Sequence, residues 1–188
     1  MLPKSYEPLE AIFQSVKENI EQFRDVEFHF IGTGKTPGDE NGFNVKSLAE
    51  KFGLWQTLVF EYPKRIPYLD VLVHLNSADG IFILGSTEPH YTPSKIYQGV
   101  LSKKPIFAVL HSKSTAVNII RESRSGQVLD FDGEADVETI RKNFAAAFKN
   151  YLEFMSTYDP EKIDKLILNE YSAYAVTSKL AKLLEKII

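Results

Sequence analysis

The sequence predicts an α/β protein with a doubly wound parallel sheet of the Rossmann-like type, followed by a long C-terminal helical segment. Short apolar runs typical of strands alternate with segments of helical periodicity up to about residue 131. Turns rich in glycine and proline separate them, and beyond Val137 only helical patterns follow. Such alternation is typical of a parallel sheet with right-handed crossovers and helices on both faces.

Composition limits the classes that this chain can belong to. Its 188 residues, 44% apolar and 25% charged, are enough for one compact domain, and no linker divides 1–188. A net charge of -3 argues against a nucleic-acid partner, and the lack of cysteine excludes disulfides. The four histidines show no metal-ligand spacing, and no apolar run approaches the roughly 20 residues of a transmembrane helix. We therefore expect a soluble, cytoplasmic protein.

The first half of the chain opens with an amphipathic helix. Apolar residues recur at helical spacing over 7–23, with Pro3 and Pro8 at the entrance. We expect this stripe in the core: Leu9, Ile12, Phe13, Val16, Ile20 and Phe23. There follow a strand over 26–31, a short helix over 45–52 closed by Gly53, and a strand over 57–60.

The second half repeats the pattern. Pro67 suits the first turn of a helix that ends near 78–79, and the unbroken apolar run 81–84 predicts a strand buried on both faces. The remaining elements expected before the C-terminal segment are a helix over 94–102, a strand over 105–110, a helix over 114–123 and a strand over 127–131.

The C-terminal segment is predicted to be helical. One long helix extends through 145–155, Asp159-Pro160 breaks it, and a final helix covers 169–188. The apolar residues of this last helix could form a partner surface, but core packing is the interpretation we favour: Tyr171, Tyr174, Leu180, Leu183 and Ile187.

The turn Gly32-Thr33-Gly34 invites a nucleotide-binding interpretation, because glycines let backbone amides approach phosphates. The Rossmann fingerprint would need glycine or alanine at position 37, which is proline, and the P-loop would need glycine at position 29, which is histidine. Two interpretations remain open, a plain turn after a strand and a glycine-rich wall of a ligand cleft.

Two acidic features have simple structural interpretations. Asp79 stands where a helix gives way to a strand and is expected to be a turn residue. The run Asp130, Asp132, Glu134 and Asp136 lacks the spacing of a calcium loop, so we expect it to be solvated.

Most candidate chemistry collects in residues 88–98, after a predicted buried strand. Thr92 or Ser94 can cap the following helix, whose free amides at 94–96, together with Lys95, would attract a phosphate. Glu88 can bind sugar hydroxyls, and Gln98 can reach a ribose diol. The alternative is an ordinary capped helix behind a polar loop.

The passage from Glu88 to Pro105 resembles the C-terminal domain of retaining GT-B glycosyltransferases, close to glycosyltransferase family four. Those proteins carry a glutamate, seven residues and a second glutamate that enters a helix, then Gly-x-Pro and a strand. Counting back from Pro105 places the second, ribose-binding glutamate at Gln98 and the first, sugar-binding one at His90. Neither position keeps the glutamate; Glu88 lies two residues earlier, and a Pro-Ser-Lys helix start suggests another branch of the superfamily.

The resemblance covers most of the chain and implies a donor-binding domain. It implies that Gly32 and Gly34 line the cleft, that the loop near Arg65 approaches the base, and that the last helix returns toward another domain. It further implies a nucleoside diphosphate sugar, such as a UDP-sugar, as ligand and no metal cofactor. Lys4 is a weak counterpart of the basic residues that contact the diphosphate.

A GT-B enzyme also needs an acceptor-binding domain, for which 188 residues leave no room. We therefore expect a fragment of a longer hexosyltransferase that is inactive in isolation, and no catalytic residue can be assigned. The alternatives are a non-catalytic nucleotide-binding or assembly module and a GT-B sugar-nucleotide epimerase, whose carboxylate and histidine pairs we do not find.

Overall fold

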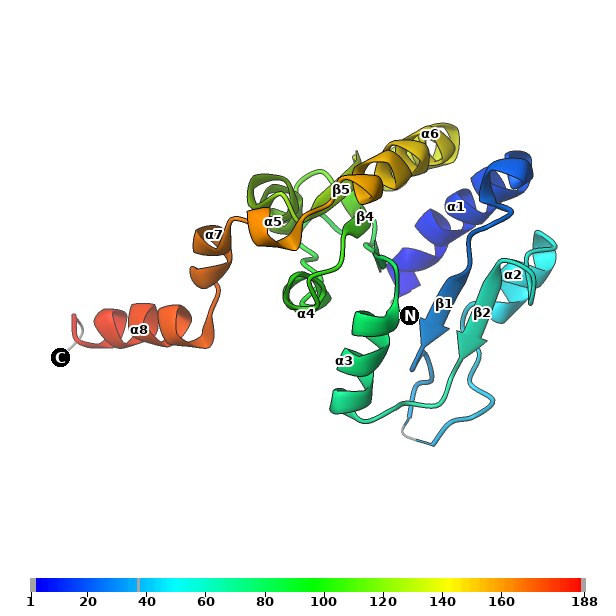
Figure 1. The fold of residues 1–188 in the computed structure, drawn as a ribbon. Coiled ribbons are helices and arrows are strands. Elements are labelled where there is room, and N and C mark those ends of the chain that lie inside the picture. Colours follow the sequence, from blue (N-terminus) through cyan, green and yellow to red (C-terminus); the bar gives the residue numbers. More distant parts are fainter. Residues whose placement is uncertain (1–2, 37, 187–188) are drawn as a thin grey trace.

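The computed structural model describes residues 3–36 and 38–186 and confirms the α/β class (Figure 1). Its strands are β1 (Phe28–Ile31), β2 (Val59–Tyr62), β3 (Ile81–Leu84), β4 (Ile106–His111) and β5 (Gly126–Phe131). Its α-helices are α1 (Tyr6–Glu18), α2 (Lys46–Lys51), α3 (Tyr68–Ser77), α4 (Lys95–Leu101), α5 (Thr115–Ser123), α6 (Val137–Ser156), α7 (Lys165–Asn169) and α8 (Ala173–Leu184). None of these helices is long and apolar enough to cross a membrane.

All strand pairs are parallel, and they form two hydrogen-bonded groups. β1 pairs with β2, while β3, β4 and β5 follow one another in a three-stranded sheet. β4 is the central strand of its sheet, contacts α5 and α6, and is buried along its whole length. The strand expected at 81–84 is β3, which packs on a core cluster with each face, although only Ile81 and Ile83 are fully buried while Phe82 and Leu84 are half-buried.

Aromatic side chains join the two strand groups. The Phe82 ring of β3 packs edge-on against Phe28 and Phe30 of β1, with ring centroids 5.7 and 6.4 Å apart. Edge-to-face pairs of this kind add about 0.5–1.5 kcal/mol beyond the area they bury. The same core therefore runs from β1–β2 to β3–β5.

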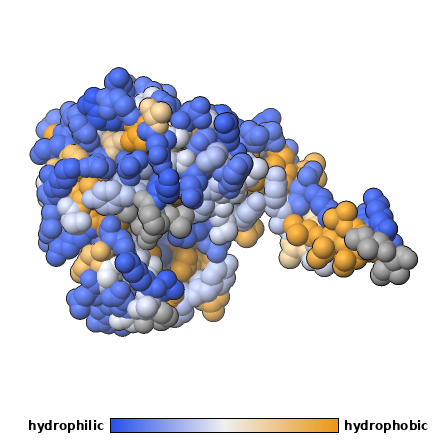
Figure 2. Space-filling model, turned by 180° about the vertical axis from the view of Figure 1, so that it is seen from behind, coloured by the Kyte–Doolittle hydropathy of each residue, from blue (hydrophilic) through white to orange (hydrophobic). Residues whose placement is uncertain are grey.

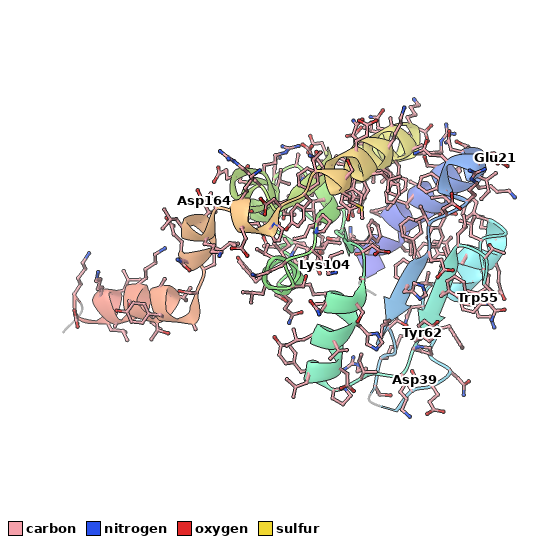
Figure 3. All side chains as sticks on the ribbon, viewed as in Figure 1. Glu21, Asp39, Trp55, Tyr62, Lys104 and Asp164 are labelled. Carbon is pink, nitrogen blue, oxygen red and sulfur yellow. The ribbon has the colours of Figure 1, made fainter. Side chains whose placement is uncertain are left out.

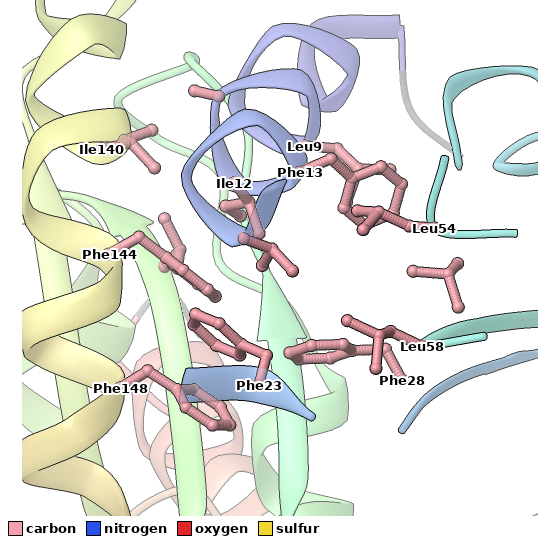
Figure 4. Close-up of a cluster of buried hydrophobic side chains, with 14 of the residues drawn as sticks. Leu9, Ile12, Phe13, Phe23, Phe28, Leu54, Leu58, Ile140, Phe144 and Phe148 are labelled. Carbon is pink, nitrogen blue, oxygen red and sulfur yellow. The ribbon is translucent and has the colours of Figure 1, made fainter. Parts of the chain in front are cut away.

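The main core lies beneath α1 and α6 (Figure 4). Phe23 stacks on Phe144 and contacts Phe148, with centroids 5.9 and 5.1 Å apart, and Phe107 of β4 reaches the same rings. The phenol of Tyr151 is also buried here, and its hydroxyl donates to the Pro105 carbonyl. Burial raises the pKa of this phenol.

The first helix is shorter than the predicted 7–23. α1 ends at Glu18, and a separate 3-10 turn, Ile20–Phe23, follows. The Asn19 side chain donates to the Ser15 carbonyl and satisfies a terminal acceptor of the helix. This break turns Phe23 into the core, while Ile20 is 38% exposed, against expectation.

Other boundaries shift for local reasons. The strand expected at 57–60 is Val59–Tyr62, because a turn occupies Leu54 to Leu58, whose amide donates to the Leu54 carbonyl. Gly53 follows α2 with φ +69, as the predicted glycine cap requires. The final helix expected over 169–188 does not begin at 169, because α7 ends there. α8 begins after Ser172, whose hydroxyl caps it by accepting from the Ala175 amide.

The last helix does not pack in the core. α7 contacts α5, but α8 projects from the body, with apolar side chains along it (Figures 1 and 2). Tyr174 is 84% exposed, and Leu180 and Leu183 are exposed as well. The core assignment of this helix was therefore wrong. Tyr171, 44% exposed, packs its ring at a tilt against Tyr97, and Ile187 lies outside the described residues.

Candidate functional site at the carboxyl ends of the strands

The Gly32-Thr33-Gly34 turn follows β1 at the carboxyl end of the β1–β2 pair, where Tyr62 and Asp39 also lie (Figure 3). Gly32 has φ +73, and a Cβ on Gly34 would stand 2.7 Å from the Pro63 carbonyl oxygen. Both glycines are thus required by the backbone itself. The plain-turn interpretation explains them without a ligand.

Arg65 closes the same turn from the end of β2. Its guanidinium donates from Nε to the Gly34 carbonyl at 3.0 Å and from Nη2 to the Lys35 carbonyl at 2.9 Å. The structure therefore brings Gly32, Gly34 and Arg65 together at one turn. Arg65 remains exposed and keeps further N–H groups for a ligand.

A buried carboxylate that the sequence analysis missed organises this loop. Glu61 of β2 is 6% exposed and accepts from the Thr33 hydroxyl at 2.5 Å. It also accepts from three backbone amides at the start of α2, those of Asn44, Val45 and Lys46, at 2.7–2.9 Å. These four donors satisfy the buried carboxylate oxygens by hydrogen bonding. The feature of the sequence that could have revealed Glu61 is the position of an acidic residue within an otherwise apolar and aromatic strand.

Residues 88–91 line a hollow of about 490 Å³ beyond the end of β3. The Tyr91 amide donates to the Glu88 carbonyl at 3.2 Å, and the Ser114 hydroxyl donates to the Tyr91 carbonyl at 2.8 Å. Partial burial raises the pKa of the Tyr91 phenol. Glu88 and His90 are exposed at this hollow, so both are available to a ligand.

The start of α4 differs in detail from the expected phosphate seat. Ser94 occupies the cap position but makes no side-chain cap, and the Thr92 hydroxyl pairs with Thr115 at 2.8 Å. The Ile96 amide, expected to be free, donates to the Pro93 carbonyl, because the first turn is tight. Lys95 is exposed and Gln98 is half-buried one turn further along.

Lys4 lies near this segment. Its carbonyl accepts from the Thr87 amide at 3.0 Å, while its ammonium forms an ion pair with Glu134. Glu134, and to a lesser extent Glu88 and Glu7, raise the pKa of Lys4. The Lys4 charge is thus engaged by Glu134 next to Thr87.

The acidic residues singled out in the sequence lie at exposed or half-buried positions. Asp79 is exposed next to the start of β3. Asp130, half-buried within β5, pairs with Arg121, and after the strand Asp136 accepts from the Asp132 amide at 3.0 Å. Across 3–36 and 38–186, no group of three or more His, Asp or Glu side chains is arranged to hold a metal ion.

The polar residues at the carboxyl ends of β3 and β4 were only partly foreseen. Sequence reasoning found Glu88 to Gln98 but missed Thr87, His111 and the contacts from Ser114 and Thr115. Ligands in open parallel sheets bind at such strand ends, so a histidine closing the buried run 106–111 was a usable signal.

Comparison with known proteins identifies two solved structures of the same fold. Neither protein-family models nor curated protein sequences give a match. A glycosyltransferase from Rickettsia africae ESF-5 superposes with a TM-score of 0.67 at 16% identity, over 97% of this chain and 45% of that one. WaaG, a glycosyltransferase involved in lipopolysaccharide biosynthesis, gives a TM-score of 0.52 at 16% identity, over 87% of this chain and 43% of WaaG. This chain therefore has a glycosyltransferase-like fold and spans less than half the length of either protein.

Proposed function

We propose that this chain is the donor-binding domain of a retaining GT-B glycosyltransferase similar to family four, and that it binds a nucleoside diphosphate sugar. The observation that carries the proposal is the position of residues 88–91. They form a hollow beyond the carboxyl end of β3, which is where ligands bind in open α/β sheets. The fold shared with two glycosyltransferases supplies the class of ligand.

In this proposal, different residues of the segment 88–98 bind different parts of the nucleotide sugar. Lys95 and the amides at 94–95 face the diphosphate and stabilise the leaving group electrostatically, without a metal ion. Gln98 binds the ribose, and Glu88 or His90 contacts the sugar. Gly32, Gly34 and Arg65 belong to the wall on the base side.

The acceptor would bind to a separate domain of the parent protein. Less than half of each glycosyltransferase structure has a counterpart in this chain. Sugar transfer by this chain alone is therefore not expected, and nucleotide binding is the appropriate first test.

Isothermal titration calorimetry with UDP, GDP and their sugars tests the proposal. We expect at least one nucleotide to bind, with the same affinity after treatment with a chelator. Lys95→Ala and Gln98→Ala should each weaken that affinity about tenfold, since each removes a hydrogen bond or charge at the ligand. Lys149→Ala, on the exposed face of α6, is the matched control. Failure of every nucleotide and nucleotide sugar to bind would contradict the proposal.

A further inference from the structure

Three strand ends bring polar side chains together beside the candidate donor segment. Thr87 follows β3 and directly precedes Glu88, His111 is the last residue of β4, and Asp132 follows β5. Register pairing places His111 beside Phe131, the residue before Asp132. The group lies next to the proposed donor site but has no assigned role in it.

Thr87 has a buried hydroxyl that lacks a partner. The residue is 6% exposed, and no atom in the described part of the chain meets hydrogen-bond geometry with its Oγ1. The hydroxyl lies on the side of Glu134, whose pKa it helps to lower after Lys4, without meeting hydrogen-bond geometry with that carboxylate. The Thr87 carbonyl and His111 Nε2 both border Gly133, at 3.8 and 3.6 Å from the position of a Cβ there. An unpaired buried hydroxyl costs about 1–3 kcal/mol, which a ligand able to hydrogen-bond to it would recover.

His111 has a ring nitrogen that can donate a hydrogen bond on the side of Asp132. The residue is 4% exposed, and its Nδ1 accepts from the Lys113 amide at 3.1 Å. The proton of a neutral ring therefore lies on Nε2. A Cβ on Gly133 would stand 3.6 Å from Nε2, and Gly133, with φ +75, adopts a conformation that suits glycine.

The distance between His111 and Asp132 selects the kind of ligand atom. Nε2 is 3.8 Å from Asp132 Oδ1, which is too far for a direct hydrogen bond. One oxygen beside this line can lie about 2.8 Å from both atoms. It must accept from Nε2–H and donate to the carboxylate, and a hydroxyl group does both.

The charges around the group favour a neutral ligand over a phosphate. Asp132 is 72% exposed at its side chain, and Glu134 already uses the Lys4 ammonium. A phosphate has no proton to donate to Asp132 when fully ionised, and these carboxylates would repel it.

We propose that Thr87, His111 and Asp132 form a subsite for hydroxyl groups of the sugar carried by the nucleotide. This assignment rests on the proposed function. It makes the subsite responsible for the difference in affinity between a nucleotide sugar and the free nucleoside diphosphate.

The test is the ratio of the Kd of the nucleoside diphosphate to that of its sugar, measured by calorimetry. Asp132→Asn and Thr87→Val keep shape and should lower this ratio about tenfold and threefold, respectively, with nucleoside diphosphate affinity unchanged. Asp70→Asn and Thr177→Val, both at exposed positions, are the matched controls. Circular dichroism verifies that each variant is folded.

An unchanged ratio in both variants overturns the subsite. Equal loss of nucleoside diphosphate and nucleotide sugar would instead assign these residues to the ribose and overturn the sugar assignment. The His111 ring signals in NMR during titration with free glucose and galactose give a second measurement, which needs no nucleotide. A shift of these signals in the wild type that Asp132→Asn abolishes supports the subsite, even if no nucleotide binds. Failure of nucleotides to bind would refute only the proposed function. No shift of the signals on addition of either sugar counts against the subsite.

Discussion

The helices α6 and α8 have similar amphipathic sequences and opposite environments. α6 buries apolar side chains against α1 and the sheet, including Ile140, Phe144 and Phe148. α8 has no buried residue among those described, and its leucines face solvent (Figure 2). Helical periodicity therefore predicts which side chains share a face, whereas only the tertiary structure shows whether anything covers that face.

The largest expected difference between the two helices is in stability. Phe144→Ala removes a ring that stacks on Phe23 and meets Phe107 and Phe148, so it should lower the free energy of unfolding by about 3–5 kcal/mol. Urea denaturation followed by circular dichroism measures the change, with Lys149→Ala as the control on the exposed face of α6. A loss below about 1 kcal/mol would mean that the site collapses around the missing ring.

The second largest loss of stability is expected at Glu61, the buried acidic residue of β2. Glu61→Ala leaves the Thr33 hydroxyl and three backbone amides without their acceptor, which should cost about 3 kcal/mol. Glu61→Gln keeps one acceptor oxygen and should lie between the alanine variant and wild type in the same denaturation experiment. Glu122→Ala, at an exposed position of α5, is the control. Equal stability of Glu61→Ala and this control would show that water replaces the carboxylate.

The smallest effect is expected on α8. Leu180→Ser and Tyr174→Ser change side chains that are 56% and 84% exposed, so the free energy of unfolding should change by no more than about 0.5 kcal/mol. The midpoint of urea denaturation is the measurement. A loss comparable to that of Phe144→Ala would show that α8 is covered in solution, and the contrast with α6 would disappear.

The segments that the sequence predicted well are those in which short-range pattern decides the structure. The elements β3, α4, β4 and α5 appear within about two residues of their expected bounds, and Gly53 ends its helix as expected. Boundaries moved where a single side chain competed with the backbone, as Asn19 does after α1 and Ser172 does before α8.

Only those site residues that are neighbours in the sequence could be predicted from it. Glu88, His90 and Tyr91 adjoin one another in sequence, and they line one hollow. Residues on different strands, such as Thr87, His111 and Asp132, showed no common pattern. Parallel strands that are distant in sequence meet only when the sheet forms.

The sequence by itself determined the α/β class, because the spacing of apolar residues and the positions of turn residues specify helices and strands over short stretches of the chain. It also determined the polar chemistry of residues 88–98. The tertiary structure decided that β4 is the buried strand, that Glu61 anchors the glycine loop and that α8 stands uncovered. Each of these depends on neighbours far along the chain, whose positions local periodicity does not encode.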